Sequence, residues 1–372
     1  MISLQKRQDR LYDWMAQEGI ALVMIEDFEK RRNPALRWIS GQPGDALLFL
    51  SVERRSLLVP WDINLAMLHA KADTILPYTD FNRHSFNALN KALELFKTPK
   101  GSRVEISGTT PYPKFLKYVE EFSDYDIICR EAGVWAELDK YRAVKDESEI
   151  NIYRKVCTLT DDIINMLEKL VRSGKLKTEA DVALFIDAEC RRRGCEGTGF
   201  EILAAGPSRS YAIHAFPSYT GEAFGGTGLS ILDFGLKYAG YTSDVTVTFA
   251  REPLSKSQEK MLLLTEKAYK LAFSMIKGGA AGRDLGVAVD AYFSRHKKSM
   301  PHALGHGIGL EAHEAPSLRS RSDNDWVLQP GMIVSIEPGL YHPLHGGCRL
   351  ENNILVTETG GEALTDARFI RL

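Results

Sequence analysis

The sequence predicts an α/β domain followed by an α+β domain. Three observations support this prediction: a length of 372 residues, an alternation of strand-like and helical segments before about residue 138, and two β-rich blocks after it. One hydrophobic core rarely grows beyond about 250–300 residues, so this length favours two domains. Hydrophobic residues make up 44% of the chain and charged residues 26%, a balance typical of globular enzymes.

The first domain is predicted over residues 1–138. Apolar residues at helical spacing predict a helix over residues 4–18, and an apolar run predicts a strand at 20–25. Further strands are predicted at 47–52, 56–59, 103–107 and 125–129, with helical stretches near 83–97 and 112–122. Strands that alternate with helices in this way are typical of an α/β domain.

The second domain is predicted over residues 139–372, because the polar segment 138–145 reads as a linker. A long amphipathic stretch follows, and Thr178 and Asp181 resemble a capping box that opens a helix ending at Arg193. The predicted helices cover 146–171, 178–193, 257–276 and 282–297, and the β-rich blocks cover 229–250 and 331–357. This mixture predicts an α+β domain.

Charge and composition exclude several classes of partner. The net charge of -2 provides no basic field for nucleic acid. The N-terminus lacks the apolar stretch of a signal peptide, and the longest apolar runs are too short to span a bilayer, so we expect a cytoplasmic protein without membrane partners. Five cysteines without close pairing suggest neither a disulfide framework nor a zinc ribbon.

Two aspartates lie in a predicted hairpin. The strand-like runs 229–235 and 241–250 are separated by a turn signal that ends in Gly240. If the turn centres on Tyr238 and Ala239, Asp233 faces Asp244, and like charges about 5 Å apart repel unless a cation lies between them. An ordinary turn or strand-end role remains the alternative for either aspartate.

Three histidines lie close together in a glycine-rich segment, 301–316. These are His302, His306 and His313. Glycines at 305, 307 and 309 argue against a helix, and therefore against the helical His-Glu-x-x-His zinc motif. A single histidine would more often be a core or surface group, but three in such a setting favour a functional site.

Two glutamates complete the candidate site. Glu337 ends a predicted buried strand before Pro338 and Gly339, and strand alternation puts Glu351 on the same face as Arg349. Alone, the Arg349 and Glu351 pair would read as an ordinary surface ion pair. Two aspartates, one histidine and two glutamates together suit Mn, Co, Fe or Zn, and four carboxylates balance the charge of two divalent cations.

With these motifs the chain resembles the pita-bread metallopeptidases, a superfamily of methionine aminopeptidase, prolidase and aminopeptidase P, with metal-free creatinase as a relative. The resemblance covers essentially the whole chain, from the creatinase-like N-terminal motif Asn33–Gly41 through the junction Tyr141–Ile150 to the five ligand motifs in order. It implies a creatinase-like N-terminal domain before a pita-bread catalytic domain. The N-terminal domain places the chain nearer to the Xaa-Pro peptidases and creatinase than to methionine aminopeptidase.

The resemblance also implies roles for individual residues. The metal ligands would be Asp233, Asp244, His306, Glu337 and Glu351. Glu337 would shuttle a proton, His313 and His214 would act in catalysis as donors to the oxyanion, and His302 and Arg349 would bind substrate. The implied reaction is hydrolysis of an N-terminal Xaa-Pro bond in a peptide or dipeptide by a metal-bridging hydroxide, and the implied assembly is a homodimer.

Four positions depart from the family pattern. Many members have Arg where Val247 stands, Pro in place of Ile213, and Asp in place of Asn352, and several prolidases have Arg in place of Ser317, near Arg319 and Arg321. Because these residues are neighbours of the ligands, they affect the expected substrate preference more than metal binding.

Two other functions remain as alternatives. One is a creatinase-like C–N hydrolase, but creatinase lacks the metal set that this chain has. The other is a catalytically silent peptide-binding module, which would be expected to have lost ligands, and none is lost here.

Overall fold

The computed structural model describes residues 4–372. The chain divides into two compact units, one ending at Arg142 and one running from Ala143 to Leu372. The division falls inside the segment 138–145 predicted as a linker, where helix α6 (Val134–Ala143) ends, and this segment is helical as far as Ala143. Val134 and Leu138, four positions apart, are both buried, and Lys140 and Arg142 in the last turn suit the negative end of the helix. Within residues 4–372, no helix has the length and apolar character needed to cross a membrane.

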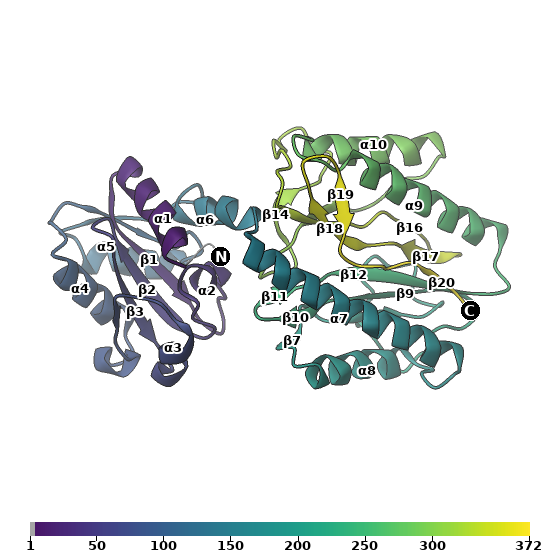
Figure 1. Ribbon diagram of the computed structural model, residues 1–372, viewed down its shortest axis with the longest axis horizontal. Coiled ribbons are helices and arrows are strands. Elements are labelled where there is room, and N and C mark those ends of the chain that lie inside the picture. Colours follow the sequence, from purple (N-terminus) through teal and green to yellow (C-terminus); the bar gives the residue numbers. More distant parts are fainter. Residues whose placement is uncertain (1–3) are drawn as a thin grey trace. The chain divides into compact units, whose positions relative to one another are not determined.

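The first unit is a six-stranded sheet covered by helices, as Figure 1 shows. Its strands lie in the order β4-β3-β2-β1-β5-β6. They are β1 (Ile20–Asp27), β2 (Ala46–Ser51), β3 (Arg55–Pro60), β4 (Thr74–Ile75), β5 (Arg103–Ile106) and β6 (Asp126–Ile128). The helices are α1 (Leu4–Glu18), α2 (Pro34–Ser40), α3 (Ile63–His69), a 3₁₀ turn η1 (Tyr78–Phe81), α4 (Ser85–Phe96) and α5 (Tyr112–Glu121).

Strand alternation explains why both faces of this sheet are covered. Leu22 and Met24 of β1 pack in one core with Leu89 of α4 and Tyr118 of α5. Val23 and Ile25, which are also buried, point to the opposite face, where α1 and α2 contact β1. A sheet with helices on both faces confirms the predicted α/β domain.

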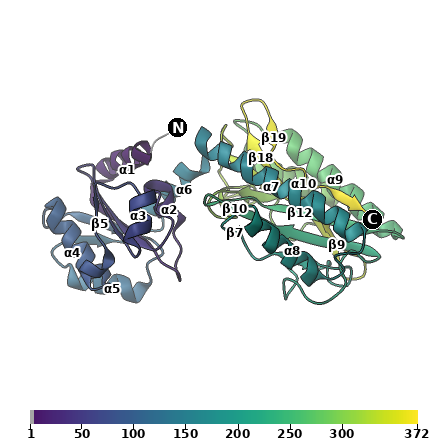
Figure 2. The ribbon, with the colours of Figure 1, turned by 60° about the horizontal axis from the view of Figure 1, so that its bottom comes forward.

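The second unit combines four long helices with several small sheets. The helices are α7 (Glu147–Arg172), α8 (Glu179–Arg192), α9 (Lys256–Met275) and α10 (Gly282–Arg295). Figures 1 and 2 show the strands between the pair α7 and α8 and the pair α9 and α10. Asp146, Thr178 and Ser255 each form a capping box, which explains where three of the four helices begin.

Two of these sheets carry the candidate ligands. One has the strand order β20-β12-β9-β8, and the other has the order β14-β13-β15-β18-β19. Their strands are β8 (Leu203–Ala205), β9 (Gly228–Phe234), β12 (Val245–Arg251), β13 (Gly305–Gly307), β14 (Glu314–Ser317), β15 (Ile333–Ile336), β18 (Asn352–Val356), β19 (Gly361–Ala363) and β20 (Phe369–Arg371). Smaller sheets join β7 (Gly197–Thr198), β10 (Leu236–Tyr238) and β11 (Tyr241–Thr242), and pair β16 (Gly339–His342) with β17 (Gly346–Arg349).

The predicted register of the aspartate hairpin is wrong by two residues. Asp233 faces Thr246, not Asp244, because the turn centres on Ala239 and Gly240 and places Tyr238 opposite Tyr241. Both turn residues have positive φ, 48° for Ala239 and 88° for Gly240, as a two-residue hairpin turn of this twist requires. Asp244 therefore lies two positions from the partner of Asp233, which keeps both side chains on one face.

Candidate metal centre

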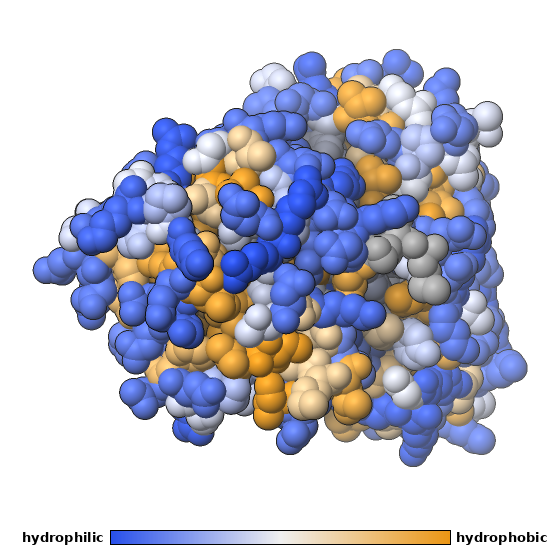
Figure 3. Space-filling model, turned by 60° about the vertical axis from the view of Figure 1, so that its left-hand side comes forward, coloured by the Kyte–Doolittle hydropathy of each residue, from blue (hydrophilic) through white to orange (hydrophobic). Residues whose placement is uncertain are grey.

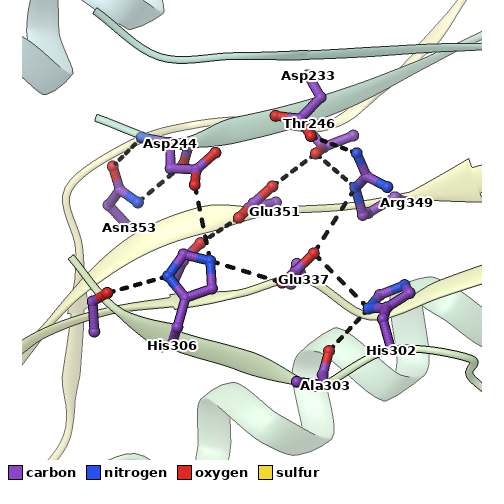
Figure 4. A network of polar contacts seen from close by, with 12 residues as sticks. Asp233, Asp244, Thr246, His302, Ala303, His306, Glu337, Arg349, Glu351 and Asn353 are labelled. Atoms are coloured by element: carbon purple, nitrogen blue, oxygen red, sulfur yellow. Dashed lines mark hydrogen bonds and ion pairs between the residues drawn. The ribbon is translucent and has the colours of Figure 1, made fainter. Parts of the chain in front are cut away.

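Strand ends bring the five predicted ligands together. Asp233 lies in β9, Asp244 immediately precedes β12, and His306 is the middle residue of β13. Glu337 follows β15 directly, and Glu351 lies between β17 and β18. The two sheets meet where the amide of Glu351 donates to the carbonyl of Thr246 at 3.1 Å. Figure 4 shows Asp244, His306, Glu337 and Glu351 pointing toward one another.

Glycines on both sides of His306 allow the strands to approach closely. A Cβ at Gly305 would lie 1.9 Å from the carbonyl oxygen of Ser335, and one at Gly307 would lie 1.9 Å from that of Ala315. Neither position therefore accepts a side chain. The Gly-His-Gly sequence thus serves the packing of β13 between β14 and β15 and fixes the backbone of His306.

The ligand atoms form overlapping groups of the size a metal ion requires. Asp233, Asp244 and Glu351 form one group, and His306, Glu337 and Glu351 form a second, with the atoms of each group within 4.8 Å of one another. Glu351 belongs to both groups. A third group joins Asp244 and His306 to His313, whose role was predicted to be catalytic. Two triads that share a carboxylate match the pattern of a two-metal site.

Burial makes this cluster electrostatically costly by itself. Burial raises the pKa of Asp233 to about 6. Burial and the neighbouring Glu351 carboxylate hold the pKa values of Asp244 and Glu337 well above their ordinary range. Burial lowers the pKa of His306 to about 3, so its imidazole is neutral, which is the form that binds metals.

One orphaned atom shows that the cluster fits divalent cations. Oδ1 of Asp233 is buried and, within residues 4–372, has no hydrogen-bond partner, while its Oδ2 accepts from Arg349 at 2.5 Å. A buried carboxylate oxygen without a partner is costly unless a cation compensates it. Four carboxylates and one imidazole supply the hard and borderline donors that such cations prefer.

Arg349 lies behind the ligands as a fully buried guanidinium, 1% exposed. It donates to Thr246 Oγ1 at 2.8 Å, to Tyr341 Oη at 2.9 Å and to the Ile213 carbonyl at 3.1 Å, besides Asp233. Within residues 4–372, it is the single predicted site residue that does not line the cavity described next. Its contacts hold Asp233 in place, and substrate binding by Arg349 stays a prediction.

The ligands line a cavity of about 660 Å³. The other predicted site residues, His214, His302 and His313, line it as well. The rings of His306 and His313 meet edge to face with centroids 4.2 Å apart. His302 has Nε2 at 3.0 Å from Tyr341 Oη and Nδ1 at 3.8 Å from Glu337 Oε2, and burial lowers its pKa to about 4.

The positions that depart from the family pattern lie partly in the protein interior and partly at the cavity. Val247 is fully buried and pairs with Leu232 in the sheet, and Asn352 binds Thr365 and Ala367 through its side chain. Ile213 and Ser317 line the cavity, as does the exposed Arg319. Arg321 pairs with Asp323 at 2.7 Å on the surface.

Sequence reasoning missed the residues that hold the ligands from behind. Thr246 Oγ1 donates to Glu351 Oε2 at 2.7 Å, and Ser335 Oγ donates to Glu351 Oε1 at 2.6 Å. Asn353 binds the backbone of Asp244 twice, accepting from its amide at 3.0 Å and donating to its carbonyl at 2.9 Å. Thr246 shares a strand face with Asp244, a signal that could have identified it, but no local signal marks Asn353 as the residue that binds the backbone of Asp244.

Replacing Asn353 by Ala should weaken metal binding about 10- to 100-fold, since two buried hydrogen bonds that fix Asp244 are lost. The same loss should lower the free energy of unfolding by roughly 2 kcal/mol. Calorimetric titration with Mn²⁺ and thermal melts measure both effects. Asn352→Ala is the matched control, because it also loses buried amide contacts but toward Thr365 and Ala367. Equal metal affinities in the two variants would contradict the role given to Asn353.

Comparison with protein families and curated sequences gives consistent matches. The model of metallopeptidase family M24 matches residues 151–358. A protein from Methanocaldococcus jannaschii described as an uncharacterized peptidase is 30% identical, and the match covers 74% of this chain and 75% of that protein. The Xaa-Pro dipeptidase of Pyrococcus horikoshii is 28% identical, and the match covers 97% of each chain.

Comparison with solved structures tests the fold. The X-Pro aminopeptidase of Thermotoga maritima superposes with a TM-score of 0.85 at 24% identity, covering 98% of this chain and 99% of that one. At this identity the likeness concerns the fold alone. It confirms the predicted fold class, an α/β N-terminal domain followed by an α+β pita-bread domain.

Proposed function

Because the chain belongs to metallopeptidase family M24, whose model matches residues 151–358, we propose that it hydrolyses the N-terminal Xaa-Pro bond of short peptides with two divalent cations. The observation that carries this proposal is the pair of ligand triads that share Glu351 at one cavity. The match to an Xaa-Pro dipeptidase over 97% of both chains supports the substrate class. We further propose that the first unit, predicted as domain 1–138, is a creatinase-like domain and that the second, predicted as domain 139–372, is the catalytic domain.

Asp233, Asp244, His306, Glu337 and Glu351 would hold the cations. When bound, Mn, Co, Zn or Fe ions supply the Lewis acidity that polarises the substrate carbonyl and activates water for attack. The chain's own contribution is to fix the ligands: Arg349 holds Asp233, Asn353 holds the backbone of Asp244, and the hydroxyls of Thr246 and Ser335 hold Glu351.

Glu337 is the residue we assign to proton transfer. Its carboxylate lies at the cavity, with Oε1 at 3.7 Å from His306 Nε2 and Oε2 at 3.8 Å from His302 Nδ1. It would accept a proton from the attacking water and return it to the amine that leaves as the peptide C–N bond breaks. His302 would keep Glu337 oriented, since the ring is itself fixed by Tyr341.

His214 and His313 are proposed to contact the substrate. Both rings line the cavity and both residues are exposed, so they can meet a peptide entering it. An imidazole N–H from either side can donate to the oxyanion that develops on the carbonyl under attack. His313 also lies within the third ligand triad, which supports a place close to the cations.

We propose that dipeptides are preferred, with Arg319 binding the substrate carboxylate. The Arg319 side chain is exposed at the cavity and forms no ion pair within residues 4–372. A guanidinium that has no carboxylate partner can receive one from a ligand. Arg321, which is already paired with Asp323, is less suited to this role.

The test is an assay of the metal-loaded protein with Xaa-Pro dipeptides, longer Xaa-Pro peptides and Xaa-Ala dipeptides. We expect the highest kcat/KM for Xaa-Pro dipeptides. Arg319→Ala should raise KM about tenfold or more for the dipeptide and much less for the longer peptide, whereas Arg321→Ala should change neither. Absence of turnover of every Xaa-Pro substrate with each of the four metals would refute the proposed function.

The first unit supports the proposal of a homodimer. It exposes several large apolar side chains, and Figure 3 shows apolar groups gathered on the face of the molecule that it views. The exposed large apolar side chains of the first unit include Trp61, Met67, Leu68, Tyr112, Leu116 and Val119. Such surfaces commonly mark protein interfaces. Light scattering tests the dimer: the mass of a single chain would contradict it.

We also propose that the protein works in the cytoplasm. The cysteines within residues 4–372 are all free, including Cys190 and Cys195, whose thiols interact. Unpaired thiols fit a reducing compartment. Recovery of the native protein mainly outside the cytoplasmic fraction of its cells would contradict this location.

A further inference from the structure

One wall of the cavity is an irregular segment that carries His214. Leu203, Ile213, His214, Ala215 and Ser218 all line the cavity. Between β8, which ends at Ala205, and β9, which begins at Gly228, the chain has no regular helix or strand. The first part of this connection, residues 206–220, is called the histidine loop below.

Within the described residues, no hydrogen bond fixes the His214 ring. It is exposed, and within residues 4–372 its imidazole has no hydrogen-bond partner. The backbone, by contrast, is fixed at the preceding residue, because Arg349 donates to the carbonyl of Ile213 at 3.1 Å. The position of the ring at the cavity therefore depends on the backbone of the histidine loop.

Glu179 connects the two ends of the histidine loop. This residue is the first of α8 and is fully buried. Its Oε1 accepts from the amide of Gly206 at 2.7 Å, while its Oε2 accepts from the amide and the hydroxyl of Thr220 at 2.8 Å and 2.7 Å. One carboxylate thus joins the first and last residues of the loop.

The same carboxylate also reaches across the loop. Glu179 pairs with Arg209, whose second guanidinium nitrogen donates to the carbonyl of Pro217. Backbone hydrogen bonds attach this part of the chain to the start of α8. The amide of Glu179 donates to the carbonyl of Glu222, and the amide of Ala180 donates to the carbonyl of Thr220, each at 2.9 Å. The contacts of Glu179 lie on both sides of His214 in the sequence but never on His214 itself.

We propose that Glu179 is a positioning residue that sets the place of His214 at the cavity through the backbone of the histidine loop. Within residues 4–372, Glu179 is not among the residues that line the cavity, so it does not touch the substrate. The inference rests on the proposed function for its catalytic consequence. The first residue of α8 would then help to fix the geometry of a site whose other residues lie mostly at strand ends.

Glu179→Gln is the sharpest test of this role. It keeps the size of the side chain but leaves one acceptor oxygen and introduces an NH₂ group that faces donors. If its oxygen serves Gly206, its NH₂ faces the amide of Thr220 and the guanidinium of Arg209, neither of which can accept a hydrogen bond, and the Thr220 hydroxyl is the one group there that can turn to accept it. The link between the two ends of the loop is then weakened without a cavity.

Glu105→Gln is the matched control. Glu105 is as buried as Glu179 and, like it, accepts from backbone and from an arginine: from the amide of Val134 at 2.7 Å and from Arg130 at 2.6 Å. It lies in the first unit, on β5, and does not contact the histidine loop. Any general cost of replacing a buried glutamate should appear in both variants.

Hydrogen exchange measures the loop without reference to catalysis. Glu179→Gln should speed amide exchange in residues 206–220 at least about tenfold, and Glu105→Gln should leave it unchanged. Thr220→Ala, which removes one donor and keeps Glu179, should act in the same direction by a smaller factor. Unchanged exchange in both Glu179→Gln and Thr220→Ala would overturn the proposal whatever the protein hydrolyses.

A double-mutant cycle measures the action through His214. In the wild-type background Glu179→Gln should lower kcat/KM for an Xaa-Pro dipeptide roughly 10- to 100-fold, because a displaced group loses its alignment with the reacting atoms. In the His214→Ala background the same change should cost no more than about twofold. Equal losses in both backgrounds would overturn the proposal, whereas an inactive wild-type protein would refute the proposed function and leave the exchange test decisive.

Discussion

Replacing Glu337 by Gln should lower kcat for an Xaa-Pro dipeptide by about 10³-fold or more in the metal-loaded protein. The amide keeps the shape of the side chain but cannot take up a proton, and general acid–base catalysis alone accounts for about 10²- to 10⁴-fold in rate. The folded state should not suffer in the metal-free protein, because burial and the Glu351 carboxylate already raise the pKa of Glu337 well above its ordinary value. Steady-state kinetics and a thermal melt measure the two effects.

Glu189→Gln provides a control for the loss of a carboxylate as such. Glu189 pairs with Arg192 and Arg193 near the end of α8 and, within residues 4–372, is not part of the cavity lining. Its kcat should match that of the wild-type protein. A Glu337→Gln or Glu337→Ala protein with full metal-dependent activity would show that the proton is carried by another group.

Removing divalent cations with a chelator should abolish hydrolysis and lower the melting temperature by about 5–10 °C. A ligand present at 100 times its Kd stabilises the folded state by about 2.7 kcal/mol, and each kcal/mol shifts Tm by about 2–4 °C in a domain of this size. The physical reason is the burial of Asp233, Asp244, Glu337 and Glu351 around one cavity, where cations relieve their repulsion. Elemental analysis of the loaded protein should find two ions per chain.

The chelation experiment has an internal control in Asp244→Asn. This variant lacks a carboxylate that belongs to two of the three ligand triads, so the chelator should change its Tm much less than that of the wild type. Reloading the wild-type protein with Mn, Co, Zn or Fe should restore both activity and Tm, and the ranking of the four identifies the preferred metal. Full activity of the chelated wild-type protein would exclude the proposed cation chemistry.

Much of the fold follows from local patterns in the sequence. Apolar periodicity and capping residues locate α7, α8, α9 and α10 to within about two residues, because both signals are contained in the helices themselves. The polar segment 138–145 contains the last turns of α6, which its polar composition does not reveal. Val134 and Leu138, spaced four apart and both buried, were the signal for it.

The hairpin shows where local patterns fail. Alternation identified both strands, but the register depends on the φ angles of the turn, and Ala239 adopts a positive φ that alanine rarely favours. The predicted turn centre, Tyr238 and Ala239, lies one position before the observed one, Ala239 and Gly240. The result is Thr246, not Asp244, opposite Asp233.

The candidate site divides in the same way. The ligand types and their motifs are readable because each motif is short, as with the glycines around His306. The contacts that orient them are not, because they join distant segments: Asn353 reaches Asp244 across 109 positions, and Glu179 reaches Thr220 across 41. Hydrogen bonds between such segments leave no periodicity in the sequence.

The junction of the two sheets at Thr246 and Glu351, which lie 105 positions apart, has a consequence for the making of the protein. A nascent chain emerges from its N-terminus, so Asp233, Asp244, His306 and Glu337 are all synthesised before Glu351. Until then neither cation triad that uses Glu351 can exist. Truncation before Glu351 should therefore leave a polypeptide that cannot retain its cations, however well its earlier half folds.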